Sequence, residues 1–265
     1  MININKDAVI KAIQNNKRLD GRKLDEFREI QILPNYIDKN PEGFALVKIG
    51  RTKVLAGVKL GVGTPYSDSP DEGVLMTGAE LAPIAAPEFE SGPPREDAIE
   101  LARVIDRGIR ESNMIDVKKL CIKEKEKVWM VFLDLHILDY DGNLFDAGAL
   151  AAVTALMTAK VPTYDEKTDK VDYSKYSGKL ELNEIPISVT ARKINGKLVF
   201  DPDANEEEVV DARLTFAFKE NGNVCAMQKG GETSLTKDET LEYMKKSYAQ
   251  SKEIRKKLKS LKLDK

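Results

Sequence analysis

The order of apolar segments along the chain is the feature that most restricts its fold. Two strand-length apolar runs, residues 44–49 and 53–60, flank a glycine-containing turn, which predicts a β-hairpin. Helical patterns over residues 95–112 and 146–160 lie on either side of a strand pattern at 128–138. This alternation predicts an α+β fold with mixed sheets and packed helices.

The later part of the chain repeats this order of strands followed by a helix, so we expect two related βα halves. Strands are predicted near residues 185–193, 197–200, 212–219 and 223–228, before a long terminal helix. The polar segment 163–179 is predicted as a linker. It would separate a first domain, residues 1–165, from a second domain, residues 180–265 with the C-terminal helix.

Short polar side chains predict where two of the helices begin. The N-terminal helix, residues 6–14, is expected to be capped by Asn3 or Asn5. The alanine-rich helix is expected to take Asp146 as its N-cap. Such side chains accept hydrogen bonds from the free backbone amides of the first helical turn.

The charge balance restricts how the chain could bind a polyanion. Charged residues make up 32% of the sequence, but the formal net charge is only −2. Any binding to nucleic acid must therefore come from local basic patches. Between residues 245 and 262 there are eight basic residues and one acidic residue. This stretch predicts either a solvated helix end or a weak additional patch for RNA or a partner.

The cysteines and the apolar runs bear on where the protein works. Cys121 and Cys225 are far apart and form no CxxC motif, which predicts two incidental reduced thiols. No apolar run approaches the roughly 20 residues needed to cross a bilayer, and no signal-peptide pattern is visible. We therefore expect a cytoplasmic protein without membrane contact.

The sequence lacks the residues that the common catalytic sites require. Its single histidine, His136, shares a strand face with Asp134 and could form an Asp–His couple. A structural role is the more common one for a lone strand histidine. Zinc sites rich in histidine, histidine-based triads, P-loops and GxGxxG motifs are all missing. We predict no catalytic residue, no metal ligand and no cofactor.

The helix over residues 95–112 carries a row of arginines. Arg103, Arg107 and Arg110 are spaced by four and three residues, so they fall within about 60° of one another on the helix surface. Three guanidinium groups in line could hold successive phosphates of one RNA strand. The residues predicted to face the core are Ala98, Ala102, Ile105 and Ile109.

The same arginines could instead form an ordinary ion-paired surface. Helical spacing allows three pairs, namely Glu100 with Arg103, Asp106 with Arg110, and Arg107 with Glu111. The residues alone leave both interpretations open.

Several motifs together resemble the RNase PH family of phosphate-dependent 3′→5′ exoribonucleases. They are Arg18-Leu19-Asp20-Gly21-Arg22, the hairpin at residues 43–58, and Asp141-Gly142 before the alanine-rich helix. The segments 80–83, 87–94 and 100–107 resemble the non-catalytic RNase PH-like subunits of the archaeal exosome. The similarity covers almost the whole chain.

This resemblance implies a set of partners and contacts. It implies a hexameric ring in which three such subunits alternate with three catalytic RNase PH-like subunits, with RNA-binding cap subunits on one face. It also implies that Arg103 and Arg107 contact single-stranded RNA near the active site of the catalytic partner. Arg110 is added to this RNA-binding set from the helix geometry alone.

The chain departs from the catalytic members of the family at the phosphate site. Those members are expected to hold phosphate with a Gly-Ser/Thr-Arg stretch at a helix N-terminus. Here Leu144 and Phe145 offer no side-chain donors, and Asp146 would repel the anion. Arg213 stands where one catalytic carboxylate is expected, and Glu207 lies near the position of the other.

These features predict a non-catalytic ring subunit that shapes the active site of its partner and helps to bind RNA. Two alternatives remain open at this point. One is an independently active phosphorolytic exoribonuclease that uses Glu207 or Asp211. The other is an assembly scaffold that makes no contact with RNA.

Overall fold

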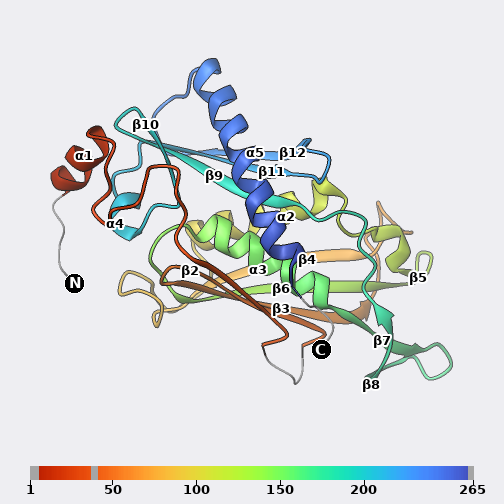
Figure 1. The fold of residues 1–265 in the computed structure, drawn as a ribbon. Helices are drawn as coiled ribbons and strands as arrows, with labels where there is room; N and C mark the ends of the chain where they lie inside the picture. The colour runs from red at the N-terminus through yellow and green to blue at the C-terminus, as the bar shows by residue number, and fades with distance from the viewer. Residues whose placement is uncertain (1–5, 37–40, 262–265) are drawn as a thin grey trace.

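The computed structural model describes residues 6–36 and 41–261 (Figure 1). The first half contributes three α-helices and a six-stranded sheet. Two of these helices, α2 (Glu96–Ser112) and α3 (Leu144–Thr158), form the layer between this sheet and the sheet of the second half. The remaining helix is α1 (Lys6–Gln14), and the strands are β1 (Ile30–Pro34), β2 (Gly43–Ile49), β3 (Thr52–Gly63), β4 (Val74–Leu81), β5 (Cys121–Lys123) and β6 (Lys127–Asp139). The strand order is β1-β2-β3-β6-β4, with β5 also paired to β6. The sheet is mixed, because β4 runs parallel to β6 whereas the other pairs are antiparallel.

The second half contributes a four-stranded antiparallel sheet with the order β10-β9-β11-β12. Its elements are β9 (Ile187–Ile194), β10 (Lys197–Phe200), α4 (Ala204–Glu207), β11 (Ala212–Phe218), β12 (Val224–Gly230) and α5 (Lys237–Lys259). In the register of β9 with β11, Thr190 lies opposite Thr215, and their hydroxyl groups are 2.9 Å apart. The predicted α+β fold with mixed sheets and packed helices is confirmed.

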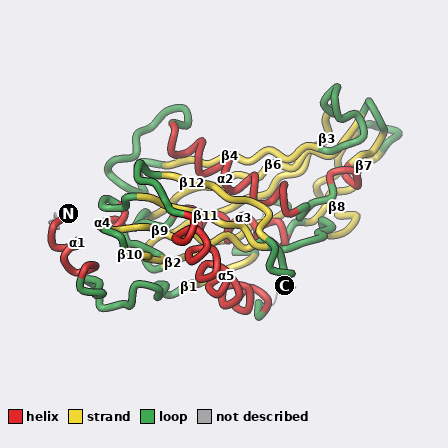
Figure 2. The backbone as a smooth tube through the Cα atoms, turned by 90° about the horizontal axis from the view of Figure 1, so that it is seen from above, coloured by secondary structure: helices red, strands yellow, loops and turns green. Residues whose placement is uncertain are grey.

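The two sheets enclose a layer of helices. Figure 1 shows α2 and α3 between the sheets. In Figure 2, seen from above, the two helices overlap the strands in projection. The helix α3 is apolar on all sides and almost fully buried, as expected for a helix covered by sheets on both faces. The terminal helix α5 packs against β9 and β11. Within the residues described, no helix combines the length and hydropathy needed to span a membrane.

The amphipathic pattern of α2 produces the predicted burial. All four residues expected to face the core are buried, namely Ala98, Ala102, Ile105 and Ile109. The arginine side of the helix faces solvent, between the edge strands β4 and β12. The fold therefore presents the arginine row at the surface.

Two local predictions were wrong. The polar segment 163–179, expected to be a linker, forms most of a hairpin of β7 (Lys160–Asp165) and β8 (Lys170–Lys179) that projects from the body (Figure 1). Its strands were missed because nearly every side chain of β8 is exposed, so no apolar alternation marks it. The helix α3 begins two residues earlier than expected, with Asn143 rather than Asp146 as N-cap. The expected caps Asn3 and Asn5 lie outside the described residues.

Candidate functional site

The predicted arginine row forms an open, basic surface on α2. The side chains of Arg103, Arg107 and Arg110 are all exposed. They border a hollow of about 300 Å³ on the outer side of the helix. The hollow is lined by Thr77, Ala102, Arg103, Asp106, Arg107, Arg110 and Glu111. A surface of this size and charge could accept a phosphate group or a short stretch of a polyanion.

The ion pairs on this surface differ from those expected from helical spacing. Only the pair of Asp106 with Arg110 forms, with Nε of Arg110 3.1 Å from Oδ2 of Asp106. Arg107 donates from Nη1 to Oε1 of Gln228 on β12, at 3.1 Å. Within residues 6–36 and 41–261, no carboxylate forms an ion pair with Arg103 or Arg107. Two guanidinium charges therefore remain without an internal counter-ion.

Arg110 is more restrained than the other two arginines. Besides its pair with Asp106, it donates from Nη2 to the backbone carbonyl of Leu75 on β4, at 3.1 Å. These bonds tie α2 to the edge of the first sheet. About half of the Arg110 side chain (49%) is still exposed, so part of its guanidinium remains open to a ligand.

A carboxylate of the protein itself occupies the beginning of α3. The backbone amide of Asn143 donates to Oε1 of Glu207 at 3.0 Å. Glu207 also accepts hydrogen bonds from the Tyr140 hydroxyl and from Nη2 of Arg192, both at 2.9 Å. Burial, together with the neighbouring Glu207 carboxylate, raises the pKa of Tyr140. Free amides at a helix N-terminus attract anions, and here one of them already binds an internal anion.

The two apolar residues at the start of α3 are held against the core. Leu144 and Phe145 are half-buried and pack against the hydrophobic cluster between the sheets. The guanidinium carbon of Arg213 lies 4.5 Å from the centroid of the Phe145 ring, which makes a cation–π contact. The positions that sequence comparison suggested for phosphate and a catalytic acid thus lie together, but they are filled by a packed ring and a guanidinium.

Asp146 lies in the first turn of α3 and is only 2% exposed. No hydrogen bond of normal geometry reaches either carboxylate oxygen among the described residues, although the polar side chains of Thr190 and Asn143 lie near enough to lower its pKa. Burial raises the pKa of Asp146 to about 7, against the opposing attraction of Arg192. The expectation that Asp146 repels phosphate is therefore corrected, because its carboxyl group is enclosed in the core. The carboxylate that meets the helix N-terminus is Glu207.

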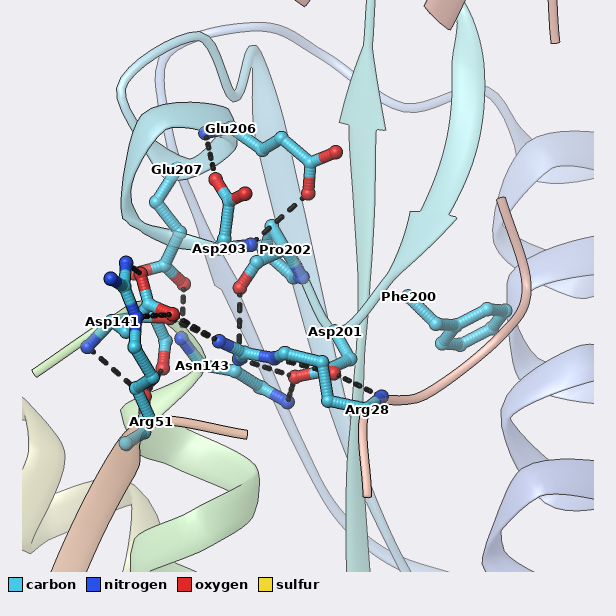
Figure 3. Close-up of polar contacts among 12 residues, drawn as sticks. Arg28, Arg51, Asp141, Asn143, Phe200, Asp201, Pro202, Asp203, Glu206 and Glu207 are labelled. Carbon is cyan, nitrogen blue, oxygen red and sulfur yellow. Dashed lines mark hydrogen bonds and ion pairs between the residues drawn. The ribbon is translucent and has the colours of Figure 1, made fainter. Parts of the chain in front are cut away.

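The arginines of the segment 18–28 have a structural role. Arg18 is 4% exposed, forms an ion pair with Glu206, and donates to the backbone carbonyls of Phe200 and Asp201. Figure 3 shows Arg28 extended between Asp141 and Asp201, to which it is ion-paired at 3.1 and 2.7 Å. This cluster joins the N-terminal segment to both halves of the fold.

The remaining candidates from the sequence lie apart from one another. His136 contacts Glu80 rather than Asp134, with Nδ1 3.1 Å from Oε2, and both side chains are largely exposed. Asp211 accepts a hydrogen bond from the backbone amide of Asn195, in the turn between β9 and β10. Among the described residues, no three His, Cys, Asp or Glu side chains gather closely enough to hold a metal ion.

The basic terminal helix is largely compensated by its neighbours. Three of its lysines are in ion pairs, namely Lys246 with Glu242, Lys256 with Glu253, and Lys259 with Glu220. The ammonium group of Lys252 lies over the ring of Tyr248. These contacts favour the interpretation of a solvated helix end.

Sequence reasoning missed the contacts that connect these features over long distances along the chain. The ion pair of Glu100 with Arg213 joins α2 to β11, and the bond of Arg107 to Gln228 joins α2 to β12. No local spacing predicts such pairs. One signal of these contacts was present in the sequence. Arg213 stands at the position expected for a catalytic carboxylate, while the apolar residues Leu144 and Phe145 stand at the position expected for phosphate.

Comparisons with known proteins give a consistent result. A model of the 3′ exoribonuclease family, RNase PH domain 1, matches residues 26–162, and the model of domain 2 matches residues 184–250. The chain is 50% identical over 232 residues to exosome complex component Rrp42 of Archaeoglobus fulgidus, covering 87% of this chain and 86% of that protein. It is 48% identical over 252 residues to Rrp42 of Methanosarcina mazei, covering 95% and 92%.

A solved structure shows the same fold. The structure is described as the Archaeoglobus fulgidus exosome with RNA bound to the active site. One of its chains superposes with a TM-score of 0.88 and 46% identity, covering 95% of this chain and 96% of that chain. The arrangement of strands and helices described above is therefore shared with a protein of known structure.

Proposed function

The chain belongs to the RNase PH family of 3′ exoribonucleases, and we propose that it is a non-catalytic ring subunit of an exosome. In this role it shapes the active site of a catalytic RNase PH-like partner and helps to bind RNA. The observation that carries the proposal is that the expected anion site at the start of α3 is filled. Glu207 accepts a hydrogen bond from the Asn143 amide, and the Phe145 ring stacks against the guanidinium of Arg213.

Catalysis by phosphorolysis needs a phosphate ion held beside the scissile bond. In this chain the Glu207 carboxylate already binds the amide of the N-cap residue Asn143, so a phosphate bound there would meet like charge at short range. Glu207, the candidate for a remaining acid, is bound by Tyr140, Asn143 and Arg192. Its hydrogen bonds are structural, which supports a subunit without chemistry of its own.

RNA binding is assigned to the arginine row of α2. Arg103 and Arg107 carry the larger part, because no carboxylate of the described segments forms an ion pair with either of them. Arg110 carries a smaller part, because Asp106 and the Leu75 carbonyl already share its guanidinium. The proposed ligand is single-stranded RNA.

The proposed partners follow from the names of the similar proteins. Relatives called exosome components, and a superposable chain from an exosome with RNA bound to its active site, support membership of an exosome. The proposed assembly is the one that the family resemblance implies, a ring in which this chain alternates with a catalytic paralogue, three copies of each. RNA-binding cap subunits would sit on one face of that ring. We also propose that the protein works in the cytoplasm.

A reconstitution assay tests whether the chain is non-catalytic. The purified chain is incubated with an RNA tail and inorganic phosphate, and nucleoside diphosphate release is measured with and without the catalytic paralogue. We expect no release from the chain alone and strong release from the mixture. Phosphate-dependent release by the chain alone would contradict the proposal and support the independent exoribonuclease.

A charge reversal tests RNA binding against a pure scaffold. In the assembled ring, Arg103→Glu with Arg107→Glu should weaken RNA binding and reduce the slope of log K against log salt by about 1.4. The control reverses two exposed lysines of α5, Lys245→Glu with Lys257→Glu, for the same change in charge. Neither lysine forms an ion pair with another described residue. Unchanged affinity and salt dependence in the α2 variant, with an intact ring, would favour a scaffold without RNA contact.

A further inference from the structure

We propose that Arg213 is a positioning residue that keeps Arg103 available to RNA by holding the carboxylate of Glu100. The inference rests on the proposed function, because it concerns the same arginine surface of α2. It assigns a role to a residue on β11 that does not itself border the RNA-binding hollow.

Helical spacing sets up a competition for Arg103. Glu100 precedes it by three residues and Asp106 follows it by three, and side chains at this spacing readily form ion pairs. A guanidinium neutralised by either carboxylate binds a phosphate less well, because the phosphate must displace a counter-ion. Arg103 is nevertheless exposed and unpaired among the described residues.

Both competing carboxylates are held elsewhere. Asp106 accepts from Nε and Nη2 of Arg110, each at 3.1 Å, and from the Thr77 hydroxyl at 3.1 Å. Glu100 is ion-paired with Nη2 of Arg213, although the two residues are more than a hundred positions apart in the sequence. Because these two acids are bound elsewhere, Arg103 has no ion-pair partner in the part of the chain that the structure describes.

The guanidinium of Arg213 is fixed in place by its surroundings. The Phe145 ring lies on one side, 4.5 Å from the guanidinium carbon. The backbone of Gly230, the register partner of Arg213 on β12, is close enough that a Cβ there would overlap the guanidinium. Only 22% of the Arg213 side chain is exposed. A cation enclosed in this way offers Glu100 a fixed partner that a mobile surface arginine cannot match.

A substitution cycle at Glu100 and Arg213 tests this role. The ring is assembled with the catalytic paralogue, and its affinity for a fluorescent oligoadenylate RNA is measured by anisotropy. We expect Arg213→Gln to weaken binding about three- to tenfold, because the freed Glu100 pairs with Arg103. Adding Glu100→Gln to that variant should restore affinity to within about twofold of the unsubstituted ring. Glu100→Gln alone should bind at least as tightly as the unsubstituted ring.

The cycle separates positioning from a merely structural role. If Arg213 acted only through packing, Glu100→Gln would not restore binding, and that result would overturn the inference, as would unchanged affinity in Arg213→Gln. Arg213→Lys serves if the glutamine variant does not assemble. The lysine keeps the charge but not the guanidinium stacked on Phe145, so we expect a smaller loss of RNA affinity, which Glu100→Gln should again reverse. A loss of affinity that Glu100→Gln does not reverse would also overturn the inference. Lys119→Gln, which breaks the exposed pair with Glu181, is the matched control and should change nothing.

Arg103→Gln distinguishes this inference from the proposed function. If Arg103→Gln leaves RNA affinity unchanged, the assignment of RNA binding to Arg103 fails, and the inference fails with it. If Arg103→Gln weakens binding, the proposed function stands, and Arg213→Gln should then add no further loss in that background. A full additional loss would overturn the inference alone.

Discussion

Replacing Asp146 with asparagine should stabilise the protein, and the gain should be larger at pH 8 than at pH 5. The side chain of Asp146 is 2% exposed, and no hydrogen bond of normal geometry reaches its oxygens among the described residues. Thr190 and Asn143, the polar neighbours that lower its pKa, can also donate to the amide oxygen of an asparagine. Burial raises the pKa of Asp146 from an ordinary value of 3.8 to about 7. Folding therefore favours the protonated form of this group.

The size of the effect follows from the difference in pKa between the folded and unfolded chains. Below pH 3.8 both states hold the proton, and the stability associated with the protonated form is fully present. As the pH rises toward 7, the unfolded chain releases the proton while the folded chain keeps it, so stability falls. At about 1.4 kcal/mol per pH unit, the two units between pH 5 and pH 7 amount to about 3 kcal/mol, as an upper limit. Asparagine has no proton to exchange and is free of this loss.

Guanidinium unfolding at pH 5 and pH 8 measures the free energy of unfolding of both proteins. The advantage of Asp146→Asn should grow by about 2 to 3 kcal/mol between the two values. Asp68→Asn is the control, because Asp68 is exposed on a loop. This substitution should change the free energy of unfolding by the same small amount at pH 5 and at pH 8. An equal effect of Asp146→Asn at pH 5 and pH 8 would mean that the buried carboxyl group is already ionised, and the reasoning would be refuted.

Two further substitutions test the cluster shown in Figure 3. Asp201→Ala should lower the free energy of unfolding by about 3 to 5 kcal/mol, because it leaves the guanidinium group of Arg28 without its main partner. A loss below about 1 kcal/mol, measured by unfolding in guanidinium chloride, would contradict this prediction. Gly142→Ala should lower the melting temperature more than Gly196→Ala. Both glycines have a positive φ, but a Cβ at Gly142 would overlap the carbonyl of Pro202, whereas a Cβ at Gly196 would face open space. An equal fall in melting temperature for the two variants would contradict the prediction.

Local periodicity was sufficient to predict α2 and its two faces. The buried residues from Ala98 to Ile109 and the exposed row from Arg103 to Arg110 depend only on helical spacing, which the sequence displays directly. The α+β fold followed in the same way, because most strands carry a buried face that marks them. Among the strands that were not predicted, β8 has no buried face to reveal it, and β1 and β5 are short.

The details of the site could not be predicted, because they depend on contacts between distant segments. Helical spacing suggested Arg103 as the partner of Glu100, but the fold brings Arg213 to it from another strand. The same spacing cannot show that Glu207 reaches the start of α3. The N-cap was misplaced because Asn143 adopts a left-handed conformation that no local pattern demands.

The filled start of α3 also limits how this lineage could change over generations. Polar donors restored at positions 144 and 145 would still face the Glu207 carboxylate, and they would remove the ring against which Arg213 is stacked. Replacement of Glu207 alone would leave the Tyr140 hydroxyl and Nη2 of Arg192 without the acceptor that they now share. Any one of these changes alone would break contacts at the start of α3 without removing all of the groups that fill it. A phosphate site at this helix would therefore require several positions to change together.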